Sequence, residues 1–135
     1  MILFLRALFL LVLASMLGVT TWASLQCPLF AVPRDVFTHP WFIATLFDAY
    51  WGFATFFVGV FWQRRAPLAR IAWFIAIMLL GNIAMSAYCL RAVFRAPRDA
   101  TLADVLTRRD DGPDWLGLAL AALGVAVVLL AWPRS

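Results

Sequence analysis

Residues 71–90 read IAWFIAIMLLGNIAMSAYCL, a run of twenty residues without a charged side chain. At 1.5 Å per residue, a helix of this length is about 30 Å long, which is the thickness of the hydrocarbon core of a bilayer. Arg70 and Arg91 stand directly outside the two ends of the run. The stretch therefore predicts a helix that crosses a membrane.

Three further apolar segments surround this stretch and set the expected fold class. Residues 7–25, 42–62 and 115–132 are each about long enough to cross a bilayer, and only Asp48 interrupts the second. The chain is 65% hydrophobic and 13% charged, whereas about a quarter of the residues in a soluble domain are charged. We expect an all-α integral membrane bundle of four transmembrane helices, forming a single domain over residues 1–135. A cleaved signal peptide is the competing interpretation of residues 7–25, with Thr21-Trp22-Ala23 as a poor cleavage site.

Residues 91–114 form the polar loop between the third and fourth segments, and they hold five Arg and five Asp. Within the loop, Thr101 and Asp104 have the spacing of a capping box, with Asp in the place of the usual Glu. The spacing predicts a short helix that lies on the membrane surface and ends before Gly112-Pro113.

The arginines on the short flanks predict the orientation, because cytoplasmic flanks carry an excess of positive charge. One side of the four-helix arrangement receives Arg6, Arg64, Arg65 and Arg70, and the first connector on the other side holds only Arg34. This count places both termini in the cytoplasm of a bacterial inner membrane. Three arginines after the third segment argue against that orientation: Arg91, Arg95 and Arg98.

Polar residues in three of the segments predict an intramembrane pocket. Antiparallel helices in sequence order would bring together the end of the first, the start of the second and the end of the third. An acid inside a membrane costs about 2.5–3.5 kcal/mol at the helix centre and therefore needs a partner. The expected pocket consists of Asp48, Asn82, Ser86 and Thr21, with Tyr50 or Tyr88 at its rim. It is either a ligand or proton site or a polar clamp that only fixes helix packing.

Small residues around Asp48 predict a packing surface on the second segment. They recur every three to four residues: Thr45, Gly52, Thr55 and Gly59. Because transmembrane helices approach one another through small residues, we expect this stripe to face other helices. Helix four offers a similar seam of Gly117, Ala121 and Gly124.

The cysteine and histidine contents narrow the chemistry. Cys27 and Cys89 would lie on the same side of the membrane, which leaves a disulfide between them open. With one histidine, His39, and no cysteine cluster, we expect no metal site. The net charge of +4 comes from arginines at the ends of the apolar segments, where they set orientation and meet lipid headgroups. We therefore expect no binding to nucleic acid.

Three segments carry a resemblance to a known family: TTWASL (20–25), HPWFIATLFDAY (39–50) and GNIAM (81–85). They resemble a domain-of-unknown-function family of small multi-pass membrane proteins from bacteria and plants. The resemblance covers residues 1–109, so the fourth helix looks like an extension. It implies no particular activity and marks these segments as the place to look for function.

Two functions follow as hypotheses. The first is a non-catalytic accessory or assembly subunit of a larger membrane complex, with lipid, quinone or carotenoid bound at its aromatic surface. Its partners would be membrane lipid and other membrane-protein subunits or copies of itself. The alternative is a homo-oligomeric small transporter or ligand-binding bundle that uses Asp48. We expect no enzymatic activity, because the sequence offers no nucleophile with an adjacent base.

Overall fold

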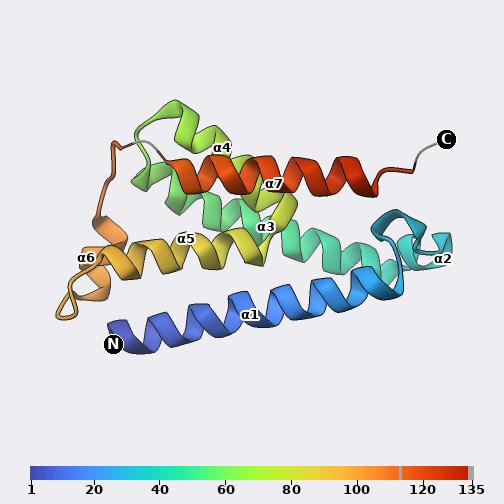
Figure 1. Cartoon of the computed structure of the whole chain (residues 1–135), viewed down its shortest axis with the longest axis horizontal. Coiled ribbons are helices and arrows are strands. Elements are labelled where there is room, and N and C mark those ends of the chain that lie inside the picture. Colours follow the sequence, from blue (N-terminus) through green and yellow to red (C-terminus); the bar gives the residue numbers. More distant parts are fainter. Residues whose placement is uncertain (113, 134–135) are drawn as a thin grey trace.

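The computed structural model describes residues 1–112 and 114–133 of the 135-residue chain. The fold is all-α, and the described residues form no strand (Figure 1). In chain order the elements are α1 (Ile2–Gln26), the 3-10 helix η1 (Leu29–Ala31), α2 (Arg34–Phe37), α3 (Pro40–Gln63), α4 (Pro67–Leu80), α5 (Asn82–Arg95), α6 (Leu102–Thr107) and α7 (Trp115–Ala131). Pro113, part of the predicted stop Gly112-Pro113, lies outside the described residues, as do Arg134 and Ser135.

Among the described helices, α1 and α3 are the two that are long and apolar enough to cross a membrane. They have 25 and 24 residues, so each is about 36 Å long at 1.5 Å per residue. α3 begins at a clear start signal: His39 Nδ1 accepts a hydrogen bond from the Trp41 backbone N–H, and Pro40 is the first helical residue. Large apolar side chains on both helices are exposed, among them Phe4 and Phe47. This surface suits lipid or another helix better than water.

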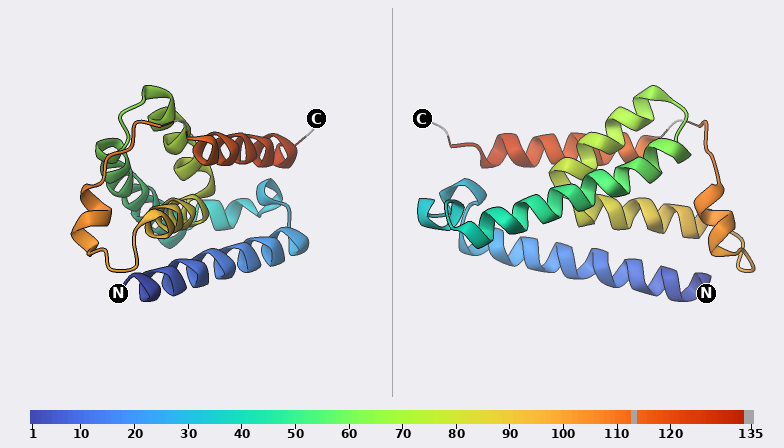
Figure 2. Two further views of the ribbon diagram at one scale, coloured as in Figure 1. Left: turned by 60° about the vertical axis from the view of Figure 1, so that its left-hand side comes forward. Right: turned by 180° about the vertical axis from the view of Figure 1, so that it is seen from behind.

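The predicted single helix over residues 71–90 is wrong, because the chain breaks at Gly81. Gly81 has φ +53° and ψ −125°, a conformation open to glycine and strained for other residues. A Cβ there would also lie 2.7 Å from Phe53 Cζ. α4 and α5 therefore form a V-shaped hairpin in which α5 runs back toward the end where α4 began (Figures 1 and 2). Each arm has 14 residues, about 21 Å, which is shorter than a bilayer core.

The hairpin changes which ends of the helices meet. Met1, the end of α3, the end of α5, α6 and the start of α7 gather at one end of the long axis, which we call the arginine end (Figures 1 and 2). The opposite end holds α2 and the last turn of α7. The arginine count of the sequence predicts both termini on one side, whereas in the structure α7 ends opposite Met1. α1, α3 and α7 each run between the two ends, and α7, with 17 residues, is the shortest of the three.

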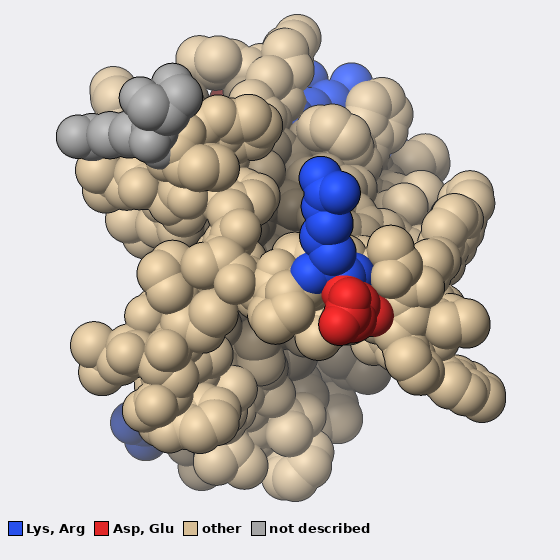
Figure 3. Space-filling model, turned by 90° about the vertical axis from the view of Figure 1, so that its right-hand side faces the viewer, with Lys and Arg blue, Asp and Glu red and all other residues tan. Residues whose placement is uncertain are grey.

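The arginines are distributed unevenly between these two ends. Nine of the ten arginines within the described residues lie at the arginine end: in the first turns of α1 and α4, in or directly after the last turns of α3 and α5, and in the loops on either side of α6. Arg34 lies in α2 at the opposite end. Figure 3 faces that opposite end, where few charged atoms are visible. The placement removes the conflict in the sequence-based count, because Arg91, Arg95 and Arg98 now share an end with Arg6 and Arg64.

Two apolar clusters hold the helices together. In the first, α7 packs along α4 through the predicted seam of Gly117, Ala121 and Gly124, and all three residues are buried. Trp73 of α4 is fully buried against this seam. In the second, Ile2 of α1 packs with residues of α5 and α6: Val93, Ala96 and Val105. The first turn of α1 is therefore part of the folded body.

Candidate functional site

The structure does not bring the six predicted pocket residues together. Asp48 and Thr21 are exposed on α3 and α1, and Asn82 is exposed at the start of α5. Ser86 is buried, but its hydroxyl donates to the carbonyls of Asn82 and Ile83 in its own helix. Because the Ser86 hydroxyl already donates its proton within its own helix, it has no proton to donate to a carboxylate on another helix.

The two tyrosines predicted at the rim of the pocket lie far apart in the structure. Tyr50 is exposed and packs edge-on against Phe53. Tyr88 is buried and donates a hydrogen bond of 2.6 Å to Gln63 Oε1 at the end of α3. Gln63 follows Asp48 by fifteen residues, about 22 Å along the helix. The turn at Gly81 carries Tyr88 to the arginine end and away from Asp48.

The small-residue stripe of α3 is uncovered within this chain. Its members Thr45, Asp48, Gly52, Thr55 and Gly59 are all exposed. A Cβ added at Gly52 or Gly59 would meet no atom within 4 Å. The predicted close packing of this face on other helices is therefore not made by α1, α4, α5 or α7, although Thr55 and Gly59 line a cavity whose other walls come from α1, α5 and α6.

Cys27 and Cys89 are free, so the disulfide left open by the sequence does not form. Cys89 lines a cavity together with Phe9 of α1. Cys27 follows Phe9 by eighteen residues, about 27 Å along α1. A disulfide requires Cα atoms within about 7 Å of each other.

The structure instead assembles a charged cluster that sequence analysis had assigned to a polar loop. Asp110 Oδ2 lies 2.8 Å from Arg95 Nη1, 3.1 Å from Arg64 Nη1 and 3.6 Å from Arg91 Nη2. Asp114 pairs with Arg64 at 3.0 Å and also with Arg91 Nη1. Three guanidinium groups thus share two carboxylates, and the excess charge of the cluster is positive.

Asp114 connects this cluster to the packing of the helices. It is the N-cap of α7 and accepts a hydrogen bond from the Gly117 backbone N–H at 3.2 Å. It also accepts the indole N–H of Trp73. With its side chain fully buried, its charge is compensated by Arg64 and Arg91 rather than by water.

Asp110 is fixed by the backbone as well as by arginine. The Gly112 backbone N–H donates to its carboxylate at 3.0 Å. Its own N–H donates to the Gln63 carbonyl, and its carbonyl accepts from Arg65, which ties the loop to the end of α3. The Gly112 hydrogen bond, followed by the charges of Arg64, Arg95 and Arg91, holds the pKa of Asp110 below its ordinary value. Asp110 is therefore anionic near neutral pH.

Arg64 is a buried arginine with spare hydrogen-bonding capacity. It is 6% exposed, and its guanidinium carbon lies 5.2 Å from the centre of the Tyr88 ring. Its Nη1 pairs with both aspartates, but its Nε has no hydrogen-bond partner among the described residues. Leaving a buried donor of a charged group unpaired is costly.

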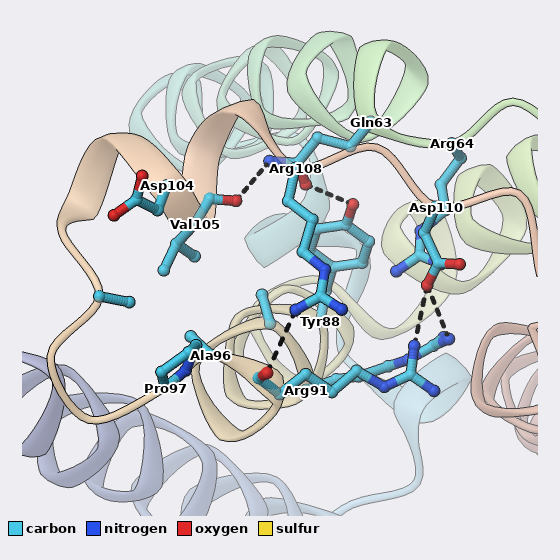
Figure 4. A pocket seen from close by; sticks show the side chains of 13 residues that line it. Gln63, Arg64, Tyr88, Arg91, Ala96, Pro97, Asp104, Val105, Arg108 and Asp110 are labelled. Carbon is cyan, nitrogen blue, oxygen red and sulfur yellow. Dashed lines mark hydrogen bonds and ion pairs between the residues drawn. The ribbon is translucent and has the colours of Figure 1, made fainter.

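A cavity of about 260 Å³ opens beside the cluster, between α3, α5 and the α6 loop (Figure 4). Its charged lining consists of four arginines and two aspartates: Arg64, Arg91, Arg95, Arg108, Asp104 and Asp110. In Figure 4 the Arg108 side chain extends across the cavity toward α5, where it donates to the Arg95 carbonyl at 3.1 Å. We call this space the arginine cavity.

A second cavity of about 310 Å³ adjoins the first and is mainly apolar. We call it the apolar cavity. It lies between α1, α3, α5 and α6, with walls that include Phe9, Phe56, Gly59 and Leu106. The two cavities share four lining residues: Gln63, Tyr88, Ala92 and Val105. Gln63 is held at this boundary, because it accepts from Tyr88 and donates to the Leu106 carbonyl at 2.7 Å.

Part of this site had a signal in the sequence. Asp114 directly precedes an apolar run, which is the pattern of an N-cap residue, and that pattern could have placed it at the start of α7. The ion pairs had no such signal, since they join residues 15 to 50 positions apart. Within residues 1–112 and 114–133, no group of three His, Cys, Asp or Glu side chains is arranged to hold a metal ion.

No family model, curated protein or solved structure matches this chain. The resemblance of residues 1–109 to a family of small membrane proteins therefore stays a prediction.

Proposed function

We propose that this chain is a non-catalytic integral membrane protein that binds anionic lipid at its arginine end and serves as an accessory or assembly subunit of a larger membrane complex. The observation that carries this proposal is the one-sided placement of the arginines. Clusters of Arg at a membrane surface attract anionic headgroups, with a contribution of about 1 kcal/mol for each residue near the surface.

The same placement sets the proposed orientation. α1, α3 and α7 cross the membrane, and α4 and α5 enter and leave on the arginine side as a re-entrant hairpin. The positive-inside rule puts the arginine end in the cytoplasm of a bacterial inner membrane. The end of α7 then lies on the opposite, periplasmic side.

Two features support a binding role over a catalytic one. The charged side chains of the cluster are arginines and ionised aspartates held in ion pairs. Guanidinium groups stay protonated and serve as donors to anions, not as nucleophiles or bases. The cavities beside them offer an anionic and an apolar part of a ligand separate surroundings.

The uncovered stripe of α3 supports a partner within the membrane. Asp48 stands on an exposed face together with Thr45 and Gly52, outside both cavities, and a carboxylate facing lipid is costly. A helix of another subunit would cover this face in the accessory role. A second copy would cover it in the transporter alternative, where Asp48 would bind or couple the transported ligand.

One purification distinguishes these roles. The chain is tagged at its C-terminus, extracted in a mild neutral detergent and analysed by native mass spectrometry. A fixed ratio to another membrane subunit, with anionic phospholipid retained, supports the proposal. A homo-oligomer without bound anionic lipid, and with transport that is lost in Asp48→Asn, would establish the transporter instead.

A further inference from the structure

The arginine cavity has the features of an anion site. Its lining holds four arginines against two aspartates, and Asp104 already accepts from the backbone N–H and the hydroxyl of Thr101. Arg108 contacts a backbone carbonyl and, among the described residues, no carboxylate. Arg64 adds a guanidinium group that is almost fully buried at the wall of this cavity. An anion in this cavity would accept hydrogen bonds from arginine N–H groups that are not all paired with protein acceptors.

The apolar cavity continues this site toward the membrane interior. It shares Gln63, Tyr88, Ala92 and Val105 with the arginine cavity, and its remaining walls are largely aliphatic and aromatic. Ligand pockets usually measure about 300–1,000 Å³, so the arginine cavity alone is below this range and the apolar cavity alone is at its lower limit. Two adjoining spaces of opposite character match a molecule with a charged head and a hydrocarbon tail.

We propose that the two cavities together bind one amphiphile with a phosphate monoester head and a single hydrocarbon chain. The phosphate lies among Arg64, Arg91, Arg95 and Arg108, and the chain lies against Phe9, Phe56 and Gly59. This assignment rests on the proposed function, since it names the lipid class and the place where it binds.

Charge and geometry favour a phosphate monoester. Such a group carries between one and two negative charges near neutral pH and has three strong acceptor oxygens. Guanidinium groups bind it with paired N–H donors, which is the geometry that arginine offers better than lysine. A second ester substituent would add bulk to a head that must fit a cavity of about 260 Å³.

The position of α6 agrees with this assignment. α6 contributes Val105 to the wall that both cavities share, and Gln63 holds its last turn through hydrogen bonds to the carbonyls of Val105 and Leu106. Leu102 and Leu106 of α6 line the apolar cavity only, whereas Asp104 lines the arginine cavity only. The two faces of one short helix thus separate the head from the chain.

The test uses the full chain in nanodiscs of a zwitterionic phospholipid, titrated in a calorimeter with empty nanodiscs as the reference. The probes are dodecyl phosphate, inorganic phosphate and dodecyl maltoside. We expect saturable binding of dodecyl phosphate, binding of inorganic phosphate at least tenfold weaker, and no saturable binding of dodecyl maltoside.

Two variants remove one half of the site each. Arg108→Gln removes a charge without leaving a carboxylate unpaired, and its control is the exposed Arg98→Gln. Gly59→Leu fills the apolar cavity from a position where no atom lies within 4 Å, and its control is Gly52→Leu on the same helix outside the cavity. Both site variants should weaken dodecyl phosphate binding at least tenfold, and both controls should leave it within about twofold. Circular dichroism and the thermal midpoint of each variant confirm that it is folded.

Three results would overturn the inference. Equal binding of inorganic and dodecyl phosphate, with no effect of Gly59→Leu, would make this a site for free phosphate. Equal effects of Arg108→Gln and Arg98→Gln would mean general surface attraction. Absence of saturable binding in a protein that still retains anionic phospholipid on purification would refute this site but leave the proposed function standing, whereas loss of both would remove the two together.

Discussion

Trp73 Nε1 donates a hydrogen bond of 2.5 Å to Asp114 Oδ2, and both side chains are buried. The bond joins α4 to the residue that caps α7. Because Asp114 also pairs with Arg64 and Arg91, one carboxylate links four elements of the arginine end. The helices at this end are therefore held by charge as well as by apolar contact.

Asp114→Asn is expected to destabilise the protein strongly. Asn keeps one acceptor oxygen, which can serve the Gly117 N–H, but it sets an amide NH2 against the Trp73 indole N–H. It also removes the charge that compensates Arg64 and Arg91. Breaking a buried ion pair costs about 3–5 kcal/mol, so the thermal midpoint in mild detergent should fall clearly. The control is Asp111→Asn, which breaks an exposed pair with Arg65 worth about 0–1 kcal/mol. Equal midpoints for the two variants would contradict the role assigned to Asp114.

Gly117→Ala is expected to disturb the α4–α7 contact. The new Cβ would lie 2.8 Å from Trp73 Nε1 and 3.0 Å from two ring carbons of the same indole. Overpacking of this kind costs about 1–3 kcal/mol. Gly18→Ala provides the matched control, since its Cβ would meet nothing within 4 Å. A thermal midpoint unchanged in Gly117→Ala would show that α7 can shift along α4.

Gly81→Ala tests the hairpin directly. Alanine must either adopt a strained backbone at φ +53° or abandon the turn, and its Cβ would lie 2.7 Å from Phe53 Cζ. Such strain costs about 1–3 kcal/mol. Gly52→Ala is the control for a glycine in open space. Denaturation monitored by circular dichroism should show a loss for Gly81→Ala only. Identical curves would argue for a straight helix over residues 71–90.

The two ends of the protein should lie on opposite sides of the membrane. A fluorescent protein that matures only in the cytoplasm should be bright at the N-terminus and dark at the C-terminus. Alkaline phosphatase, which is active only in the periplasm, should show the reverse. A bright C-terminal fusion would mean an even number of crossings, as the sequence alone suggests.

Stability should depend on pH through Asp110. Its pKa is lowered in the folded state, so its contribution is fully present above the unfolded pKa of about 4 and is lost as the pH falls through the lower folded value. The difference in unfolding free energy between the parent and Asp110→Asn should therefore be large near neutral pH and shrink below about pH 4. Asp99→Asn, an exposed change at the same end, is the control. A constant difference across this range would mean that the Asp110 charge is not what stabilises the loop.

Local patterns in the sequence predicted much of the helical structure. The capping box is present, with Thr101 accepting from the Asp104 N–H and Asp104 accepting from the Thr101 N–H, and it starts α6 as expected. α7 ends within one residue of its predicted boundary, and its small-residue seam is buried. These features depend on residues within one or two turns of each other, so one sequence is enough to find them.

The turn at Gly81 and the arginine cluster depend on backbone conformation and on contacts between distant residues, which local sequence patterns do not indicate. Hydropathy is the same for an apolar run that crosses a membrane and for one that folds back, and glycine is common in transmembrane helices. Only the sign of φ at Gly81 separates the two. A straight helix over residues 71–90 would place Tyr88 on the side of Asp48, whereas the turn at Gly81 places it at the arginine end, so the predicted pocket does not form.

The hairpin also bears on how the protein is made. α4 leaves the ribosome before its packing partner α7 exists, and Arg91 is synthesised before Asp110 and Asp114. Residues 71–90 thus emerge from the ribosome ahead of Asp110, Asp114 and α7, and they present an apolar run long enough for a translocon to insert as a spanning segment. The partners that hold α4 and α5 as a hairpin are supplied last. In the proposed membrane topology, the number of crossings is therefore decided after most of the chain has been synthesised.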